Sequence, residues 1–153
     1  MIMGRKIEAC KIMELYHGTS LVNARKILEK GFKSTADAEE HGSESGGLES
    51  LGDGIYFSTD YKTAANYATI KNTGAMKNAI IKVNFKGKLL NITDEEEFMD
   101  EFGFDLQSLN DFLDEKKDEG YHGIQIGDEI NIFDVEYLNT LPRSIDALSK
   151  IQR

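Results

Sequence analysis

Residues 54–69 read GIYFSTDYKTAANYAT, and they predict a short strand followed directly by a helix. The strand is GIYFS, because β-branched and aromatic residues suit a pleated surface. Asp60 stands at the N-cap of the helix, where its carboxylate can accept a backbone N–H of the first turn. The helix has a thin face for close packing, formed by Ala64, Ala65 and Ala68. Tyr56 lies on the predicted strand, and Tyr67 lies on the helix that follows it.

A second strand and helix are predicted upstream of this stretch. Residues 15–17 form the strand, and Thr19 or Ser20 can cap a helix that runs to about Lys30. Gly31 follows as the stop signal of this helix. Its apolar stripe consists of Ala24, Ile27 and Leu28. Between this helix and GIYFS, residues 34–53 are small, polar and glycine-rich. Loops of this length in small domains are usually lids or disordered segments, and His41 within it is interpreted as a surface residue.

Downstream, two strands and two helices are predicted before a hairpin. AIIKVNF (79–85) alternates as a strand does, and KLLNI (88–92) is predicted to be its neighbour in the sheet. An acidic helix follows over Thr93–Phe102. A second helix begins at Asp105 and ends near Gly120, with an apolar face of Leu106, Leu109, Phe112 and Leu113.

The hairpin joins HGIQI (122–126) to EINIF (129–133) through Gly127-Asp128, a tight-turn signal. Strand alternation puts Glu129, Asn131 and Phe133 on one face of the second strand, opposite two isoleucines. Residues 135–141 are predicted as a last strand, and a short helix is predicted after Pro142. Mixed helices and alternating strands indicate an α+β fold with largely antiparallel sheets, in a single domain over residues 1–153.

The composition excludes several classes of protein. A net charge of −9 over 153 residues argues against a nucleic-acid binder, which needs a basic face for phosphates. Cys10 is the one cysteine, so neither an intrachain disulfide nor a cysteine zinc motif is expected. The N-terminus breaks its apolar runs with charges, so neither a signal peptide nor a membrane span is predicted, and the cytoplasm is the expected location.

The common phosphate-binding, zinc-protease and serine-hydrolase motifs are missing from the sequence. Tyr-His-Gly occurs twice, at 16–18 and at 121–123. The first copy leads into a helix and the second into a strand pair, so they are not an internal repeat. His122 is interpreted as a structural residue that opens a strand. The histidines do not predict a metal site by their spacing.

Three pieces in order carry a resemblance to a known family. They are YHGT (16–19), GIYFS…AANYA (54–68) and DEINIF (128–133). Together they resemble the catalytic domain of poly(ADP-ribose) polymerases and related ADP-ribosyltransferases of the His-Tyr-Glu type. As an arrangement, the likeness covers roughly residues 15–138. It implies a split pair of antiparallel sheets with flanking helices, and NAD as co-substrate in the cleft between the sheets. In these enzymes a loop covers NAD where residues 34–53 stand here.

The resemblance also implies the role of individual residues. His17 would hydrogen-bond a ribose hydroxyl of NAD, and Gly18 would bind the nicotinamide carboxamide through its backbone. Tyr56 and Tyr67 would enclose the nicotinamide ring, and Glu129 would be the catalytic glutamate. The implied catalytic set is Glu129, His17 and Tyr56. The implied NAD-binding set is His17, Gly18, Thr19, Tyr56, Ser58, Ala64 and Tyr67.

Physical chemistry agrees with these assignments. Nicotinamide in NAD is a cationic pyridinium, which the face of a tyrosine attracts. Its bond to ribose breaks through an oxocarbenium-like state, and a carboxylate such as Glu129 stabilises the developing positive charge. Gly18 has no Cβ to keep a flat amide from its backbone. By themselves, however, His17, the two tyrosines and Glu129 could equally be structural residues.

Two departures from the polymerases affect the reaction. They carry a carboxamide-binding serine where this chain has Ala64, and Ser58 or Thr63 are the candidates to replace its hydroxyl. They also carry a lysine where this chain has Thr63. This second difference favours transfer of a single ADP-ribose over chain elongation. The Glu-x-Glu or Gln-x-Glu pattern of arginine-specific toxins is replaced by Gly127-Asp128-Glu129, which makes arginine a less favoured acceptor.

The sequence leaves several functions in competition. The first is a mono-ADP-ribosyltransferase that uses NAD, a pentosyl-transferring enzyme with an unidentified protein target. RNA 2′-phosphotransferases share this fold, but their phosphorylated RNA substrate suits a basic protein. The sequence is also compatible with an NAD hydrolase, and with a module that binds NAD or a protein without turnover. A phage or bacterial effector acting in a host cytoplasm is a further possibility, and the oligomeric state is open.

Overall fold

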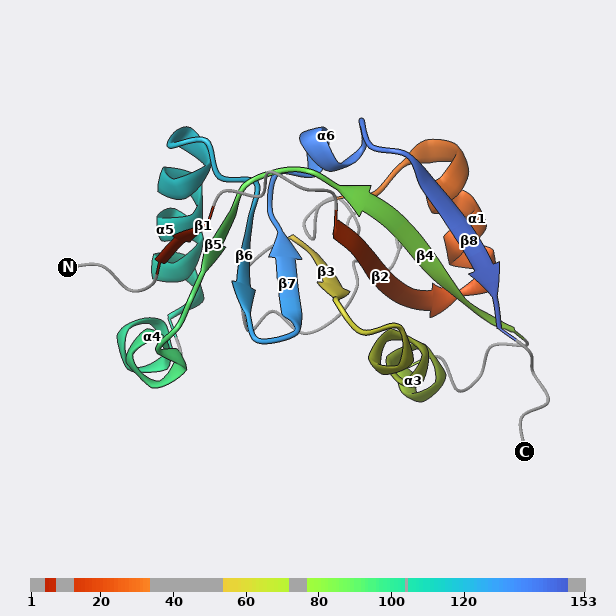
Figure 1. Ribbon diagram of the computed structural model, residues 1–153, viewed down its shortest axis with the longest axis horizontal. Helices are drawn as coiled ribbons and strands as arrows, with labels where there is room; N and C mark the ends of the chain where they lie inside the picture. Colours follow the sequence, from red (N-terminus) through yellow and green to blue (C-terminus); the bar gives the residue numbers. More distant parts are fainter. Residues whose placement is uncertain (1–4, 8–12, 34–53, 72–76, 104, 149–153) are drawn as a thin grey trace.

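The computed structural model describes residues 5–7, 13–33, 54–71, 77–103 and 105–148 (Figure 1). In this part of the chain the strands are β1 (Arg5–Ile7), β2 (Met13–Ser20), β3 (Ile55–Ser58), β4 (Asn78–Phe85), β5 (Leu89–Asn91), β6 (Gly123–Ile126), β7 (Glu129–Ile132) and β8 (Arg143–Ala147). The helices are α1 (Leu21–Lys30), α3 (Tyr61–Lys71), α4 (Glu95–Phe102), α5 (Leu106–Asp118) and α6 (Val135–Leu138). The loop predicted over 34–53, with His41, lies outside the described residues, as does Cys10.

The strands form one sheet in the order β1-β5-β6-β7-β3-β2-β4-β8. Its pairs are antiparallel except β5 with β6. The sheet is nearly divided between β2 and β3, which are paired only at Tyr16 and Ser58, whereas β2 and β4 are paired along their whole length. Figure 1 shows α4 and α5 beside the β1–β5 end and α1 beside the β8 end. The α+β class and the split antiparallel arrangement are therefore confirmed.

Apolar side chains form two clusters on opposite faces of the central strands. Ile130 and Ile132 of β7 pack in the first cluster with Leu15 and with Ile27 of α1. Tyr56 belongs to the second cluster, where α4 and α5 cover β5 and β6 and Phe133 packs at the margin. Since side chains alternate along a strand, the isoleucines of β7 face the first cluster and its polar residues face away from it. The predicted alternation of this strand is confirmed.

Local signals located the starts of α1, α3 and α5 correctly. The Ser20 side chain accepts the N–H of Asn23, Asp60 accepts that of Thr63, and Asp105 accepts that of Ser108. Each contact satisfies a backbone donor of the first turn that has no partner within the helix. The hairpin is also as predicted, with Ile126 opposite Glu129.

Two predictions near the C-terminal end of the described residues were wrong. Residues 135–138 form α6 instead of a strand, because the Asp134 side chain caps a helical turn by accepting the N–H of Tyr137. After Pro142 the chain forms β8 instead of a helix, and β8 covers the edge of β4. An uncovered strand edge leaves a row of unpaired backbone groups, which this pairing satisfies.

The predicted pairing of β4 with β5 is also wrong, because the two strands lie in different halves of the sheet. The connection from β4 to β5 packs closely against His122. A Cβ on Gly87 of this connection would lie 2.6 Å from the ring Nδ1 of His122. Nδ1 accepts the backbone N–H of Lys88 at 3.0 Å, and the ring stacks on Tyr137 with 3.8 Å between centroids. The structural interpretation of His122 is therefore confirmed.

His122 is expected to make stability depend on pH. Burial lowers its pKa from the ordinary 6.5, with Lys88 adding to the effect and Asp134 opposing it. As the pH falls below 6.5, the unfolded chain binds a proton at His122 while the folded chain does not yet bind one. The free energy of unfolding therefore falls as the pH falls toward the pKa of the folded state. Urea unfolding from about pH 8 to about pH 5 should show this decline.

The His122→Asn variant is the control, because Asn can offer an oxygen to Lys88 but does not titrate. Its free energy of unfolding should fall less steeply over the same pH range. Equal slopes for both proteins would contradict the prediction.

Candidate active site

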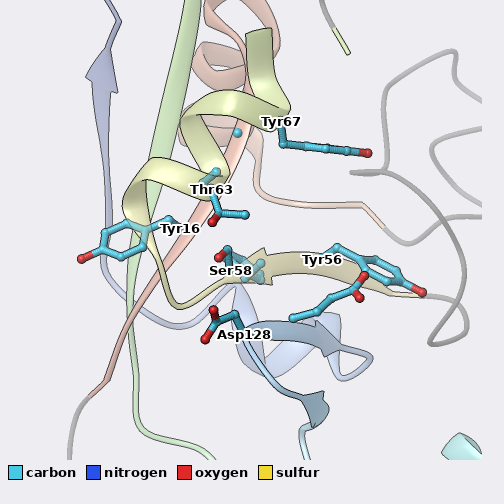
Figure 2. A pocket seen from close by; sticks show the side chains of 10 residues that line it. Tyr16, Tyr56, Ser58, Thr63, Tyr67 and Asp128 are labelled. Atoms are coloured by element: carbon cyan, nitrogen blue, oxygen red, sulfur yellow. The ribbon is translucent and has the colours of Figure 1, made fainter. Parts of the chain in front are cut away.

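A cavity of about 240 Å³ opens where β2 and β3 diverge. Its lining comes from four elements: Tyr16 and Gly18 from β2; Tyr56, Phe57 and Ser58 from β3; Thr63, Ala64 and Tyr67 from α3; Asp128 and Glu129 from the β6–β7 hairpin. Figure 2 shows the rings of Tyr56 and Tyr67 projecting to the same side, one from β3 and one from α3. Segments far apart in the sequence thus contribute to a single concave site.

The thin alanine face of α3 explains why glycine stands at position 18. A Cβ on Gly18 would lie 2.1 Å from the Ala64 carbonyl oxygen and 2.9 Å from the Ala68 Cβ. Ala64 and Ala68 are themselves buried. Close approach of strand and helix therefore requires Gly18, in addition to any contact of its backbone with a ligand.

The β6–β7 hairpin places Glu129 at the cavity. Glu129 lies opposite Ser58 in the pairing of β7 with β3, and it is exposed. Thr59 holds the tip of the hairpin: its backbone N–H donates to the Asp128 carbonyl at 3.1 Å, and its hydroxyl donates to Asp128 Oδ1 at 3.0 Å. Sequence reasoning missed Asp128 and Tyr16 as lining residues and Thr59 as the support of Asp128. For Tyr16 the available signal was strand alternation, which puts it on the same face as Gly18.

His17 and Thr19 are not among the residues that line the cavity. His17 is 2% exposed, with its ring against Phe32 and Phe57 at centroid distances of 5.7 and 5.6 Å. Its Nδ1 lies 2.7 Å from the Tyr56 carbonyl oxygen, so this nitrogen carries the hydrogen. The contact holds β3 to β2 where backbone pairing is sparse. Thr19 Oγ1 accepts from the Asn23 side chain. Their contacts with NAD stay predictions.

The hydroxyls near Ala64 differ in what they can donate. The Thr63 hydroxyl donates to Asp60 Oδ2 at 2.6 Å, so its hydrogen is already used. This bond also lowers the pKa of Asp60 and keeps it ionised. Ser58 Oγ accepts the Asp60 backbone N–H at 3.0 Å, so its hydrogen can still be donated to a ligand. Of the two candidates to replace the missing serine hydroxyl, Ser58 fits better.

The family of the chain follows from its match to a known domain. The model of the poly(ADP-ribose) polymerase catalytic domain matches residues 5–120. The chain belongs to this family. The resemblance to this family is therefore confirmed, and the general activity of the family is NAD-dependent ADP-ribosyl transfer. The match includes Gly18, Tyr56 and Tyr67, whereas Glu129 lies beyond it, and its catalytic role stays a prediction. No curated protein matches the chain.

The residues of the cavity fit the nicotinamide end of NAD, the co-substrate of the poly(ADP-ribose) polymerase family. Two tyrosine rings, a glycine backbone and a carboxylate are the groups that a cationic, amide-bearing ring requires. Among the described residues, no group of three or more His, Cys, Asp or Glu is placed to hold a metal ion. None of the described helices is long and apolar enough to cross a membrane.

Proposed function

We propose that this chain is a mono-ADP-ribosyltransferase, which breaks the nicotinamide–ribose bond of NAD and transfers one ADP-ribose to a protein target. The observation that carries the proposal is the shared cavity of Gly18, Tyr56, Tyr67 and Glu129. These residues come from different elements of the fold, and nothing in their local sequence requires them to meet.

The residues have distinct tasks in this reaction. Tyr56 and Tyr67 hold the pyridinium ring by cation–π attraction, and Gly18 offers backbone groups to the carboxamide. Glu129 stabilises positive charge as it develops on the ribose carbon. The electron pair of the breaking bond goes to the ring nitrogen, and neutral nicotinamide leaves. His17 is proposed to contact a ribose hydroxyl and also supports Tyr56 through its carbonyl oxygen.

Transfer of a single unit is favoured by the residues on α3. Thr63 stands where the polymerases carry lysine, and its hydroxyl is engaged by Asp60. Among the described residues, those that line the cavity include no lysine or arginine. These features support mono-ADP-ribosylation.

To test this function, the protein is incubated with a cell lysate and with NAD that carries a label in its adenylate part. Nicotinamide release and the macromolecule that takes up the label are then measured. Nicotinamide release together with label on a protein, as one unit per site, is the expected result. Label on RNA would favour a nucleic-acid acceptor, and a cyclic ADP-ribose phosphate from 2′-phosphorylated RNA would identify a phosphotransferase. Release of nicotinamide without label on any macromolecule would identify an NAD hydrolase. NAD binding in calorimetry with no release would identify a non-catalytic module.

Tyr67→Ala is expected to raise the KM for NAD about tenfold, because removing the ring forfeits roughly 1–2 kcal/mol of cation–π and stacking energy. Tyr67→Phe keeps the ring and should stay within a few-fold of the parent protein. Steady-state nicotinamide release over a range of NAD concentrations measures both. Ile70→Ala is the matched control, since Ile70 lies on the same helix and is 74% exposed. An unchanged KM in Tyr67→Ala would remove this residue from the NAD site.

A further inference from the structure

The cavity has two chemically different ends. Figure 2 shows the Tyr56 and Tyr67 rings projecting to one side, while Asp128 lies away from them, on the β6–β7 hairpin. If the rings hold nicotinamide, the group that replaces it must reach the ribose carbon from the side opposite to the rings. That side of the cavity presents the Asp128 carboxylate.

The Asp128 carboxylate is held in place by Thr59. The hydroxyl of Thr59 donates to Oδ1 at 3.0 Å, and the backbone bond between the two residues fixes the hairpin tip. A carboxylate has lone pairs on both oxygens, so this contact leaves room for an incoming N–H donor. Asp128 is next to Glu129 in the chain, and both line the cavity.

The surrounding charges reinforce a negative potential. Asp60 contacts both Ser58 and Thr63, and the Thr63 hydrogen bonds lower its pKa. Lys62 lowers the Asp60 pKa further, but it is exposed and does not line the cavity. A carboxylate acceptor would be repelled here, whereas an ammonium or guanidinium group would be attracted.

We infer that Asp128 is a specificity-determining residue that selects a positively charged nitrogen acceptor, the side chain of lysine or arginine, for the proposed transfer. The inference rests on the proposed function. The missing Glu-x-Glu pattern speaks against the arginine-specific toxin arrangement, but Asp128 supplies a second carboxylate beside Glu129 from the hairpin tip itself.

The step balances without another reactant. The bond between the ribose carbon and nicotinamide breaks, and its electron pair neutralises the ring nitrogen. A nitrogen of the acceptor forms the new bond to the same carbon. One N–H proton leaves that nitrogen before the bond forms, to a neighbouring carboxylate and then to water, because a lysine ammonium has no lone pair and that of a guanidinium is delocalised. Asp128 accepts a hydrogen bond from the acceptor and orients it.

Four short peptides test the inference, identical and uncharged except for one central Lys, Arg, Glu or Ser. With labelled NAD, the Lys or Arg peptide should be labelled at least about fivefold faster than the Glu and Ser peptides, the size of one exposed charge–charge contact. Comparison of the Lys and Arg arms shows which nitrogen is used. Asp128→Asn keeps an oxygen for Thr59, and it should raise the KM for the preferred peptide about fivefold with a smaller change in kcat.

Asp114→Asn is the matched control, because it removes the same charge from the exposed surface of α5. It should leave peptide labelling unchanged. Faster labelling of the Glu or Ser peptide than of the Lys and Arg peptides would overturn the inference. An equal loss of labelling rate for all four peptides in Asp128→Asn would also overturn it, because it would indicate a structural role for Asp128. Nicotinamide release with no peptide labelled overturns the inference but leaves NAD cleavage standing. Absence of nicotinamide release overturns both.

Discussion

Replacing Glu129 with Gln is expected to lower nicotinamide release from NAD by about 10²- to 10³-fold. Gln has nearly the same shape as Glu but no negative charge, so the oxocarbenium-like transition state loses its electrostatic stabilisation. The fold should be unaffected, because Glu129 is exposed and its pairing opposite Ser58 is made by the backbone. Single-turnover assays at saturating NAD measure the loss.

The matched control for this substitution is Glu136→Gln. Glu136 lies on α6, is exposed and does not line the cavity, so its loss removes the same charge elsewhere. The control should release nicotinamide at the parent rate. Undiminished release or ADP-ribose transfer by Glu129→Gln would show that this glutamate is not catalytic.

Gly18→Ala is expected to destabilise the protein by about 1–3 kcal/mol and to reduce NAD turnover with it. The new Cβ would lie 2.1 Å from a backbone oxygen of α3, which no side-chain rotation relieves. Strand β2 and helix α3 must therefore move apart, and Tyr67 moves with the helix. Urea unfolding measures the stability, and nicotinamide release measures the site.

Gly127→Asn is the comparison for stability. Gly127 has φ of 60°, which asparagine tolerates better than most residues, and nothing lies within 4 Å of the place that a Cβ would take. Its free energy of unfolding should change much less than that of Gly18→Ala. Equal stability of Gly18→Ala and the parent protein would mean that strand and helix are not packed so closely.

Most of the local structure follows from the sequence. Asp60, Asp105 and Ser20 begin helices because each offers an oxygen to a backbone N–H of the first turn. Gly127-Asp128 closes a hairpin because its turn needs a positive φ that glycine adopts without strain. Alternation along β7 separates its isoleucines from Glu129. All these signals act over a few residues, so they can be recognised without knowing the partners.

The candidate site was predicted from motifs only in part. Gly18, Tyr56, Ser58, Ala64, Tyr67 and Glu129 were named from the sequence and line one cavity. Their chemical roles remain predictions. His17 and Thr19 were named with them but lie outside the lining residues, since alternation along β2 turns them to the face opposite Tyr16 and Gly18.

By itself, the sequence determined three of the helix starts, the hairpin, the faces of the strands and the membership of the family, because these depend on neighbouring residues or on short motifs. Tertiary structure alone decided that β5 leaves β4 for β6, that β8 covers β4, and that the sheet opens between β2 and β3. Strand partners are selected by packing among segments distant in the sequence, and no local pattern specifies them. The cavity, with Asp128 held in it by Thr59, exists only because that packing leaves β2 and β3 joined at a single pair.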